Sequence, residues 1–188
     1  MKPAGLTTTL ALVLAGVATV ASAGRMDAEA QHGALLTGTG DLIGVVRDAT
    51  ERFRDVAVAE AEGYSLLFGC VSGPDSGAMG LHFVNLTLVN DGVLDPARPE
   101  IVIYEPLPNG KLKLIGADFL VFADAWHANN QATPELMGQL LHLFESPNRF
   151  GLPAFYTLHV WAWKENPNGA FVNWHPKVSC DSFSGRNP

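Results

Sequence analysis

The chain has few cysteines, few basic residues and no catalytic signature of high specificity. Only two of its 188 residues are cysteine, so its fold does not depend on a dense set of disulfides. Lysine and arginine number 12 against 19 acidic residues, and the resulting net charge of −7 argues against nucleic acids and anionic membranes as partners. The glycine-rich stretches contain neither a phosphate-binding loop nor a serine-hydrolase elbow. No reaction can therefore be assigned from motifs.

Long apolar runs are missing except at the N-terminus. Met1 and Lys2 give a short positive start, residues 6–20 are apolar, and Ala-Ser-Ala at 21–23 resembles a cleavage site. The run is too short and too rich in alanine for a good membrane span. We therefore predict a signal peptide at 1–23 and an exported protein, periplasmic or extracellular, with no membrane anchor.

The rest of the chain is expected to form one domain. Residues 24–40 are small, polar and rich in glycine, which predicts a flexible N-terminal tail. Residues 41–188 have a suitable length for a single globular domain. Export favours a disulfide between Cys70 and Cys180, which would close a long loop worth about 4–5 kcal/mol in the chain-entropy model. A thiolate metal ligand or a reactive cysteine is the alternative.

Two helices are predicted from apolar spacing. Over residues 42–57 the apolar positions recur at helical intervals, and Gly63 is a natural stop. A second helix is predicted over 134–145, with Thr133 as its cap and Pro134 at its first position.

Strand-like runs account for most of the remaining sequence. A loop rich in glycine and serine at 70–80 precedes them, and Pro-Asn-Gly at 108–110 is a strong hairpin signal. The runs lie at 81–89, 101–104, 111–115, 119–122 and 155–164. Short links between neighbouring runs favour antiparallel pairing. We therefore predict an α+β fold, with a mainly antiparallel curved sheet or partly open β-barrel, a long N-terminal helix and one later helix.

Three ionisable residues within strand-like runs form the candidate site. His82 and His159 lie inside such runs, and a third run ends on Glu105. An ionisable group within an apolar strand is costly unless a partner or a ligand compensates it. Two imidazoles and a carboxylate are also a donor set for zinc, copper, iron or manganese. The sequence thus predicts a mononuclear metal site made of these three side chains.

An ordinary structural role is open for each of these residues. Either histidine could be a core residue hydrogen-bonded to a carbonyl or carboxylate group. Glu105 could pair with Lys111 or Lys113 across the predicted hairpin. In that case Asp118 or Asp75 could supply the carboxylate.

Alternation along the last strand-like run predicts an aromatic wall beside the site. Trp161 and Trp163 share the parity of His159, and Phe83 is next to His82 in sequence. If these side chains line one cavity, it is an apolar pocket with a few polar groups, as is usual for small-molecule sites.

Several segments resemble a family of exported bacterial proteins to which no activity is attached. The resemblance rests on ATERFRDVAVAEAEGY (49–64), FGCVSG through GAMGLHFVN (68–85), RPEIVIYEP (98–106) and LHVWAWKENPNGAFVNWHPKVSC (158–180). It spans most of the chain after the N-terminal segment and implies a single intact domain. It implies no ligand and no catalytic residue.

Three functions remain open from the sequence. The first is a secreted or periplasmic protein that binds a metal ion or small molecule, a mononuclear metal enzyme being one form of it. The second is a non-metal carrier of a small apolar ligand. The third is an interaction or structural domain without a small-molecule site. The oligomeric state is not indicated.

Overall fold

The computed structural model describes residues 42–185, together with Met1. Apart from Met1, the predicted signal peptide at 1–23 and the predicted tail at 24–40 lie outside the described residues. No helix among the described residues is both long and apolar enough to span a membrane.

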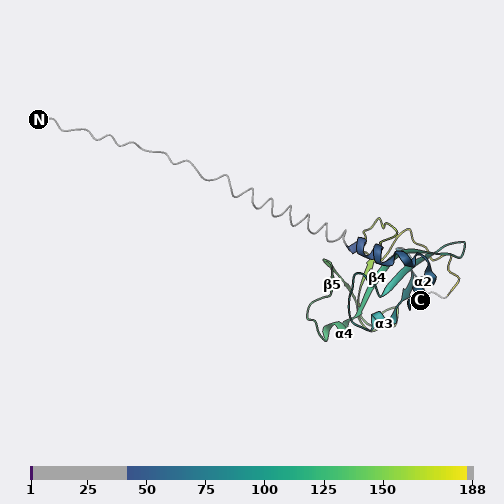
Figure 1. The fold of residues 1–188 in the computed structure, drawn as a ribbon, viewed down its shortest axis with the longest axis horizontal. Coiled ribbons are helices and arrows are strands. Elements are labelled where there is room, and N and C mark those ends of the chain that lie inside the picture. The colour runs from purple at the N-terminus through teal and green to yellow at the C-terminus, as the bar shows by residue number, and fades with distance from the viewer. Residues whose placement is uncertain (2–41, 186–188) are drawn as a thin grey trace. The chain divides into compact units, whose positions relative to one another are not determined.

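The domain is built on one six-stranded antiparallel sheet with the strand order β1-β2-β3-β4-β8-β7. Figure 1 shows β4 in the middle of this sheet. The strands are β1 (Ser65–Gly73), β2 (Gly77–Val84), β3 (Ile101–Pro106), β4 (Leu112–Phe122), β7 (His142–Phe144) and β8 (Phe155–Val160). The prediction of a mainly antiparallel, curved sheet is thereby confirmed.

The long N-terminal helix predicted from apolar spacing is not supported, because the described helices are short. Residues 42–50 are helical, the 3₁₀-helix η1 follows at Glu51–Arg54, and α2 spans Val56–Ala61. Asp55 interrupts the series with an extended backbone, and its side chain accepts a hydrogen bond from the N–H group of Ala57. Aspartate favours such a capping position over a helix interior. The apolar spacing persists because all three pieces pack on the same sheet face.

The helix predicted over 134–145 is wrong. This region contains the strand pair β5 (Glu135–Leu136) and β6 (Gln139–Leu140), followed by β7. Met137 and Gly138 connect the pair, and both have positive φ angles, of 48° and 83°. Such a two-residue turn is typical of tight hairpins. Apolar residues at helical intervals therefore do not form a helix here. The two further short helices are α3 (Leu86–Val89) and α4 (Ala123–His127).

The segment 70–80, predicted as a loop, forms most of the hairpin between β1 and β2. Its glycines permit close packing rather than flexibility. Gly77 has a φ of 80°, and a Cβ atom there would collide with the backbone of His175. The neighbouring Ala78 forms a backbone bridge with His175, which attaches the C-terminal segment to the sheet.

The predicted disulfide between Cys70 and Cys180 is confirmed. It joins β1 to the C-terminal segment across 110 positions of sequence, and no free cysteine is left in the described part of the chain. Disulfides of this kind are typical of oxidising compartments.

The predicted strands 111–115 and 119–122 are parts of one continuous strand, β4. Gly116 lies between them, and it allows the backbone of Val160 to approach closely, since a Cβ atom would meet its carbonyl oxygen. The turn predicted at 108–110 is present, and the N–H group of Gly110 donates to the carbonyl oxygen of Leu107.

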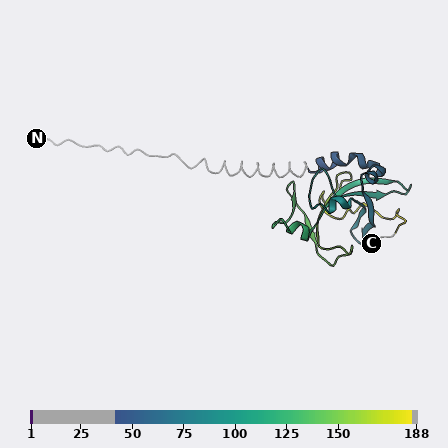
Figure 2. The same cartoon turned by 60° about the horizontal axis from the view of Figure 1, so that its bottom comes forward.

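The two faces of the sheet have different coverings. On one face, the helical residues 42–50, η1 and α2 pack on apolar side chains that include Phe119, Leu158 and Tyr104. Figure 2 shows these helical segments, in dark blue, lying along one side of the sheet. The opposite face carries a second apolar cluster that includes Leu120 and Phe155. We call the first the covered face and the second the pocket face.

Candidate metal centre

Three buried ionisable side chains on three different strands meet on the pocket face. His82 comes from β2, Asp118 from β4 and His159 from β8. Asp118 and His159 are direct partners across neighbouring strands. β3 separates β2 from β4, and it places Ile103 opposite His82 and Ile101 opposite Asp118.

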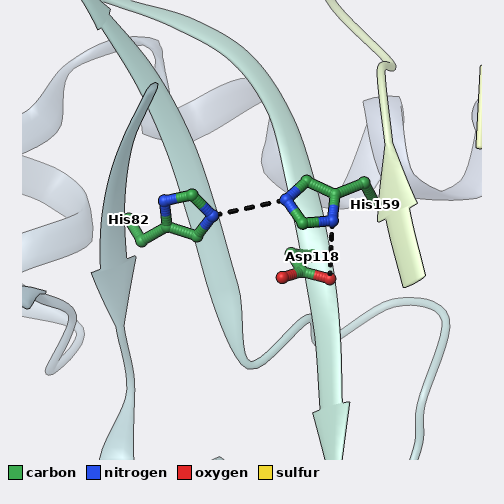
Figure 3. A group of neighbouring side chains, drawn as sticks. All are labelled: His82, Asp118 and His159. Atoms are coloured by element: carbon green, nitrogen blue, oxygen red, sulfur yellow. Dashed lines mark hydrogen bonds and ion pairs between the residues drawn. The ribbon is translucent and has the colours of Figure 1, made fainter. Parts of the chain in front are cut away.

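The curvature of the sheet brings the two histidines into contact. Across four neighbouring strands a flat sheet would separate the backbones of β2 and β8 by about 14 Å. In the structure the Nε2 atoms of His82 and His159 are 3.3 Å apart. Figure 3 shows both rings and the Asp118 carboxylate pointing toward one another. The curled sheet therefore creates a site that no single strand or hairpin contains.

The hydrogen bonds of His82 define its tautomer. Its Nδ1 atom lies 3.2 Å from the carbonyl oxygen of Gly80. Because a carbonyl oxygen only accepts, Nδ1 of the neutral ring carries the hydrogen atom. The Nε2 atom of His82 therefore presents a lone pair to His159.

His159 is the least satisfied of the three groups. Its Nδ1 atom lies 3.5 Å from Oδ1 of Asp118, and it is a buried atom without a hydrogen-bond partner. Buried polar atoms are nearly always hydrogen-bonded, so an exception needs a physical explanation. The side chain is only 4% exposed, which leaves little access for bulk water.

Asp118 is held from its other side. The hydroxyl group of Thr157 donates a 2.5 Å hydrogen bond to Oδ1 of Asp118. Burial raises the pKa of Asp118 to about 6, although the Thr157 hydroxyl and neighbouring groups act in the opposite direction. The carboxyl group is therefore mostly ionised at pH 7.

Burial keeps both imidazoles neutral. It lowers the pKa of His82 to about 4 and that of His159 to about 3, with other histidines adding to the effect. Neutral imidazoles and an ionised carboxylate are the protonation states that bind metal ions. One donor atom from each of the three residues lies within 4.8 Å of the others, so the group could hold a metal ion.

An apolar pocket opens onto these three residues. It has a cavity volume of about 90 Å³, enough for several water molecules or a small organic group. Its apolar lining includes Leu67, Phe68, Val84, Leu120, Phe144 and Phe155. Among the described residues that line it, the two histidines and Asp118 are the only ionisable ones.

Glu105, the carboxylate expected from the sequence, lies outside this group. Both of its oxygens accept hydrogen bonds of 2.7 Å from Nζ of Lys164. The alternation along β3 continues past Ile103, which lies opposite His82, but Glu105 lies two residues farther along the strand and pairs with Lys113. Asp118, considered as a substitute, takes the carboxylate position instead.

None of the three aromatic residues predicted as walls lines the pocket, although the ring of Trp161 lies 6.1 Å from that of His159. Phe83 follows His82 and points to the covered face, where it packs on Tyr104. Trp161 comes after the end of β8, and its indole N–H donates to the carbonyl oxygen of Val172. The indole N–H of Trp163 donates to the hydroxyl group of Thr50.

Phenylalanines that the sequence did not single out form the aromatic wall. Phe144 and Phe155 stack at 5.3 Å with nearly parallel rings, and Phe150 lies beside Phe68 and Phe155. Phe155 shares the strand parity of His159, which is a signal the sequence contained. Phe68 lies at a bulge of β1, Phe150 in a loop and Phe144 in the short edge strand β7. Alternation along a strand does not predict the direction of side chains in such places.

Comparisons of this chain with protein-family models, with curated proteins and with solved structures gave no match. The functional argument therefore rests on the residues and geometry described above.

Proposed function

We propose that this chain is an exported metal-binding protein in which His82, Asp118 and His159 bind one divalent transition-metal ion at the base of the apolar pocket. Zinc, copper, iron and manganese all accept this donor set. Three protein ligands leave coordination positions for water or a further ligand, as in catalytic metal sites. Export rests on the N-terminal sequence, and the disulfide between Cys70 and Cys180 supports it.

One observation carries the proposal: Nδ1 of His159 is a buried atom without a hydrogen-bond partner, and it faces the Asp118 carboxylate at 3.5 Å. A hydrogen atom on its Nε2 could bond to His82, but Nδ1 would then direct a lone pair at the Asp118 carboxylate. A hydrogen atom on Nδ1 would instead leave the two Nε2 lone pairs facing each other at 3.3 Å. Both arrangements bring lone pairs close together in a buried site, where an unpaired polar atom costs about 1–3 kcal/mol. The neighbouring Asn173 side chain, whose Oδ1 atom also lacks a partner, offers His159 one further hydrogen bond. A bound cation removes the conflict.

Protonation of Asp118 is the competing solution, since a neutral carboxyl group could donate to Nδ1 of His159. Because the pKa of Asp118 is about 6, this form is favoured in acid. We therefore expect metal affinity to fall as the pH drops below 6, where protons and metal ions compete for the same atoms.

The test is metal analysis of the purified protein after separate exposure to Zn²⁺, Co²⁺, Mn²⁺, Cu²⁺ and anaerobic Fe²⁺. We expect about one equivalent of at least one ion, and loss of binding in His82→Ala, Asp118→Ala and His159→Ala. Glu105→Gln and His127→Ala are matched controls, because both residues lie outside the cluster. Far-UV circular dichroism checks that each variant folds. Less than a tenth of an equivalent of every ion, or unchanged uptake in His82→Ala, would overturn the proposal.

The second candidate is a non-metal carrier of a small apolar ligand, which the apolar pocket lining favours. It predicts ligand uptake by the metal-free protein, and it predicts the same uptake after Asp118→Ala. The metal analysis and a ligand screen on metal-free protein separate the two functions.

A further inference from the structure

The charge of an occupied metal site is the starting point. A divalent ion held by two neutral imidazoles and one carboxylate carries a net charge of +1. Asp118 and His159 are each 3% exposed and His82 is 7% exposed, so this charge would be held away from water. An uncompensated charge in such surroundings is costly, which favours an anion as the next ligand.

No side chain of the pocket supplies the missing negative charge. Asp118 is the only acidic residue among the described residues that line the pocket. Glu100 is buried and precedes Ile101, a residue of the pocket lining. It accepts a hydrogen bond from the N–H group of Leu120, but it is not itself part of the lining. Burial raises the pKa of Glu100 to about 8, so it is largely neutral at pH 7.

The pocket also constrains the rest of the ligand. The lining contains no lysine or arginine among its described residues, so the metal ion would be the sole cation facing an anion. Away from the metal the walls are hydrocarbon, with Leu120, Phe144 and Phe155 among them. A second polar group on the ligand would lose its hydration there without gaining a partner.

We propose that the pocket takes a small apolar monoanion, a monocarboxylate with a short hydrocarbon body, whose oxygen completes the coordination of the metal ion. The hydrocarbon body lies among the phenylalanine side chains. This inference rests on the proposed metal site. Without the ion, the carboxylate would meet the Asp118 carboxylate and imidazole lone pairs, so binding depends strictly on the metal.

The experiment compares three probes on the Co²⁺-loaded protein, whose visible absorption reports ligands that enter the metal's coordination sphere. Pentanoate has both the charge and the apolar body, acetate has the charge alone, and 1-pentanol has the body alone. We expect pentanoate to bind at least tenfold more tightly than either control, because each buried methylene strengthens binding and the charge requires an anion. Calorimetry on metal-free protein should show no pentanoate binding.

Variants separate the body from the charge. Phe155→Ala removes part of the apolar wall and enlarges the pocket. It should therefore reduce the preference for pentanoate over acetate and leave the Co²⁺ stoichiometry at one. Phe83→Leu, on the covered face, should change neither quantity.

The outcomes distinguish this inference from the proposed function. Absence of bound Co²⁺ in the wild-type protein overturns both. If Co²⁺ binds stoichiometrically but pentanoate and acetate bind with equal affinity, only the claim that the ligand has an apolar body is overturned. Equal affinity for pentanoate and 1-pentanol overturns the claim that the ligand is an anion. Pentanoate uptake by the metal-free protein overturns the claim that binding depends on the metal.

Discussion

The covered face and the pocket face of the sheet are made by the same strands, yet they differ in composition. Neighbouring residues illustrate the contrast: Phe119 lies on the covered face and Asp118 on the pocket face, and Leu158 and His159 divide in the same way. The covered face is closed by helical segments and filled with apolar side chains. The pocket face carries a cavity and three buried ionisable groups. Stability supplied by one face allows the other to hold groups that a stable core would exclude.

The largest expected effect is on the covered face. Leu158→Ala should lower the free energy of unfolding by about 2–5 kcal/mol, because it leaves a cavity in a closed core. Leu120→Ala is the matched change on the pocket face, where Leu120 already borders a cavity. We expect a smaller loss there, measured by urea denaturation of both variants. Equal losses would contradict the contrast between the two faces.

Asp118→Asn should stabilise the metal-free protein while abolishing metal binding. The pKa of Asp118, raised from 3.8 to about 6, corresponds to roughly 3 kcal/mol of penalty for the ionised form. Because asparagine must satisfy its own amide, we expect a gain of about 1–3 kcal/mol at pH 7, measured by denaturation without metal. With excess Zn²⁺ the order should reverse, since only the wild type gains binding energy. A destabilised metal-free variant would argue against a strained site.

The pH dependence of stability should come from buried carboxyl groups near the pocket face. Burial raises the pKa of Glu100 from 4.5 to about 8, so the folded protein holds a proton that the unfolded chain releases. This stability is present at low pH and is lost as the pH rises through 8. Between pH 6.5 and 8 Glu100 should lower the stability of the metal-free protein by about 1.6 kcal/mol. His82 and His159 should offset roughly half of this loss, because they are neutral when folded and the unfolded chain gives up its protons there over the same range.

Glu100→Gln is the control for this pH effect. It keeps an oxygen for the N–H group of Leu120 and should abolish the fall in stability over the same range. Denaturation midpoints at several pH values measure both proteins. A slope that survives in Glu100→Gln would assign the effect to another group.

The smallest effect is expected at Phe68, where a positive φ of 66° places a bulky residue in the left-handed region. Phe68→Gly relieves strain on the order of 1 kcal/mol but loses contact with Phe150. We expect a net change in unfolding free energy below about 1 kcal/mol. Phe150→Ala removes the same ring contact without relieving strain. Thermal melting of both variants should therefore show a larger loss of stability in Phe150→Ala than in Phe68→Gly.

Sequence reasoning recovered the sheet better than the helices. Strand signals such as those in β3 and β8 are dense in β-branched and aromatic residues, and the turn at 108–110 has its own chemistry. The segment 134–145 misled because apolar residues at helical intervals are not specific to helices. Met137 and Gly138 required positive φ angles there, and only the glycine signals this in sequence.

The site was recovered in part, for a reason that lies in the sheet's geometry. Alternation within a strand identifies residues that share a face, which selected His82 and His159. It does not say which residues of different strands lie opposite each other, because strand pairing and bulges, such as the extra residue Ile115 in β4, set the register. The choice between Glu105 and Asp118 depended on that register, and so did the identity of the pocket walls.

The placement of the three site residues on β2, β4 and β8 has a consequence for the order of assembly. His82 and His159 are 77 positions apart, so no early hairpin contains more than one of the two imidazoles. The hairpin of β1 and β2 can form locally, but the second histidine arrives only when β8 docks against β4. A metal ion would therefore bind a nearly complete domain rather than guide its folding. Occupancy of the site would then report that the last central strand of the sheet is in place.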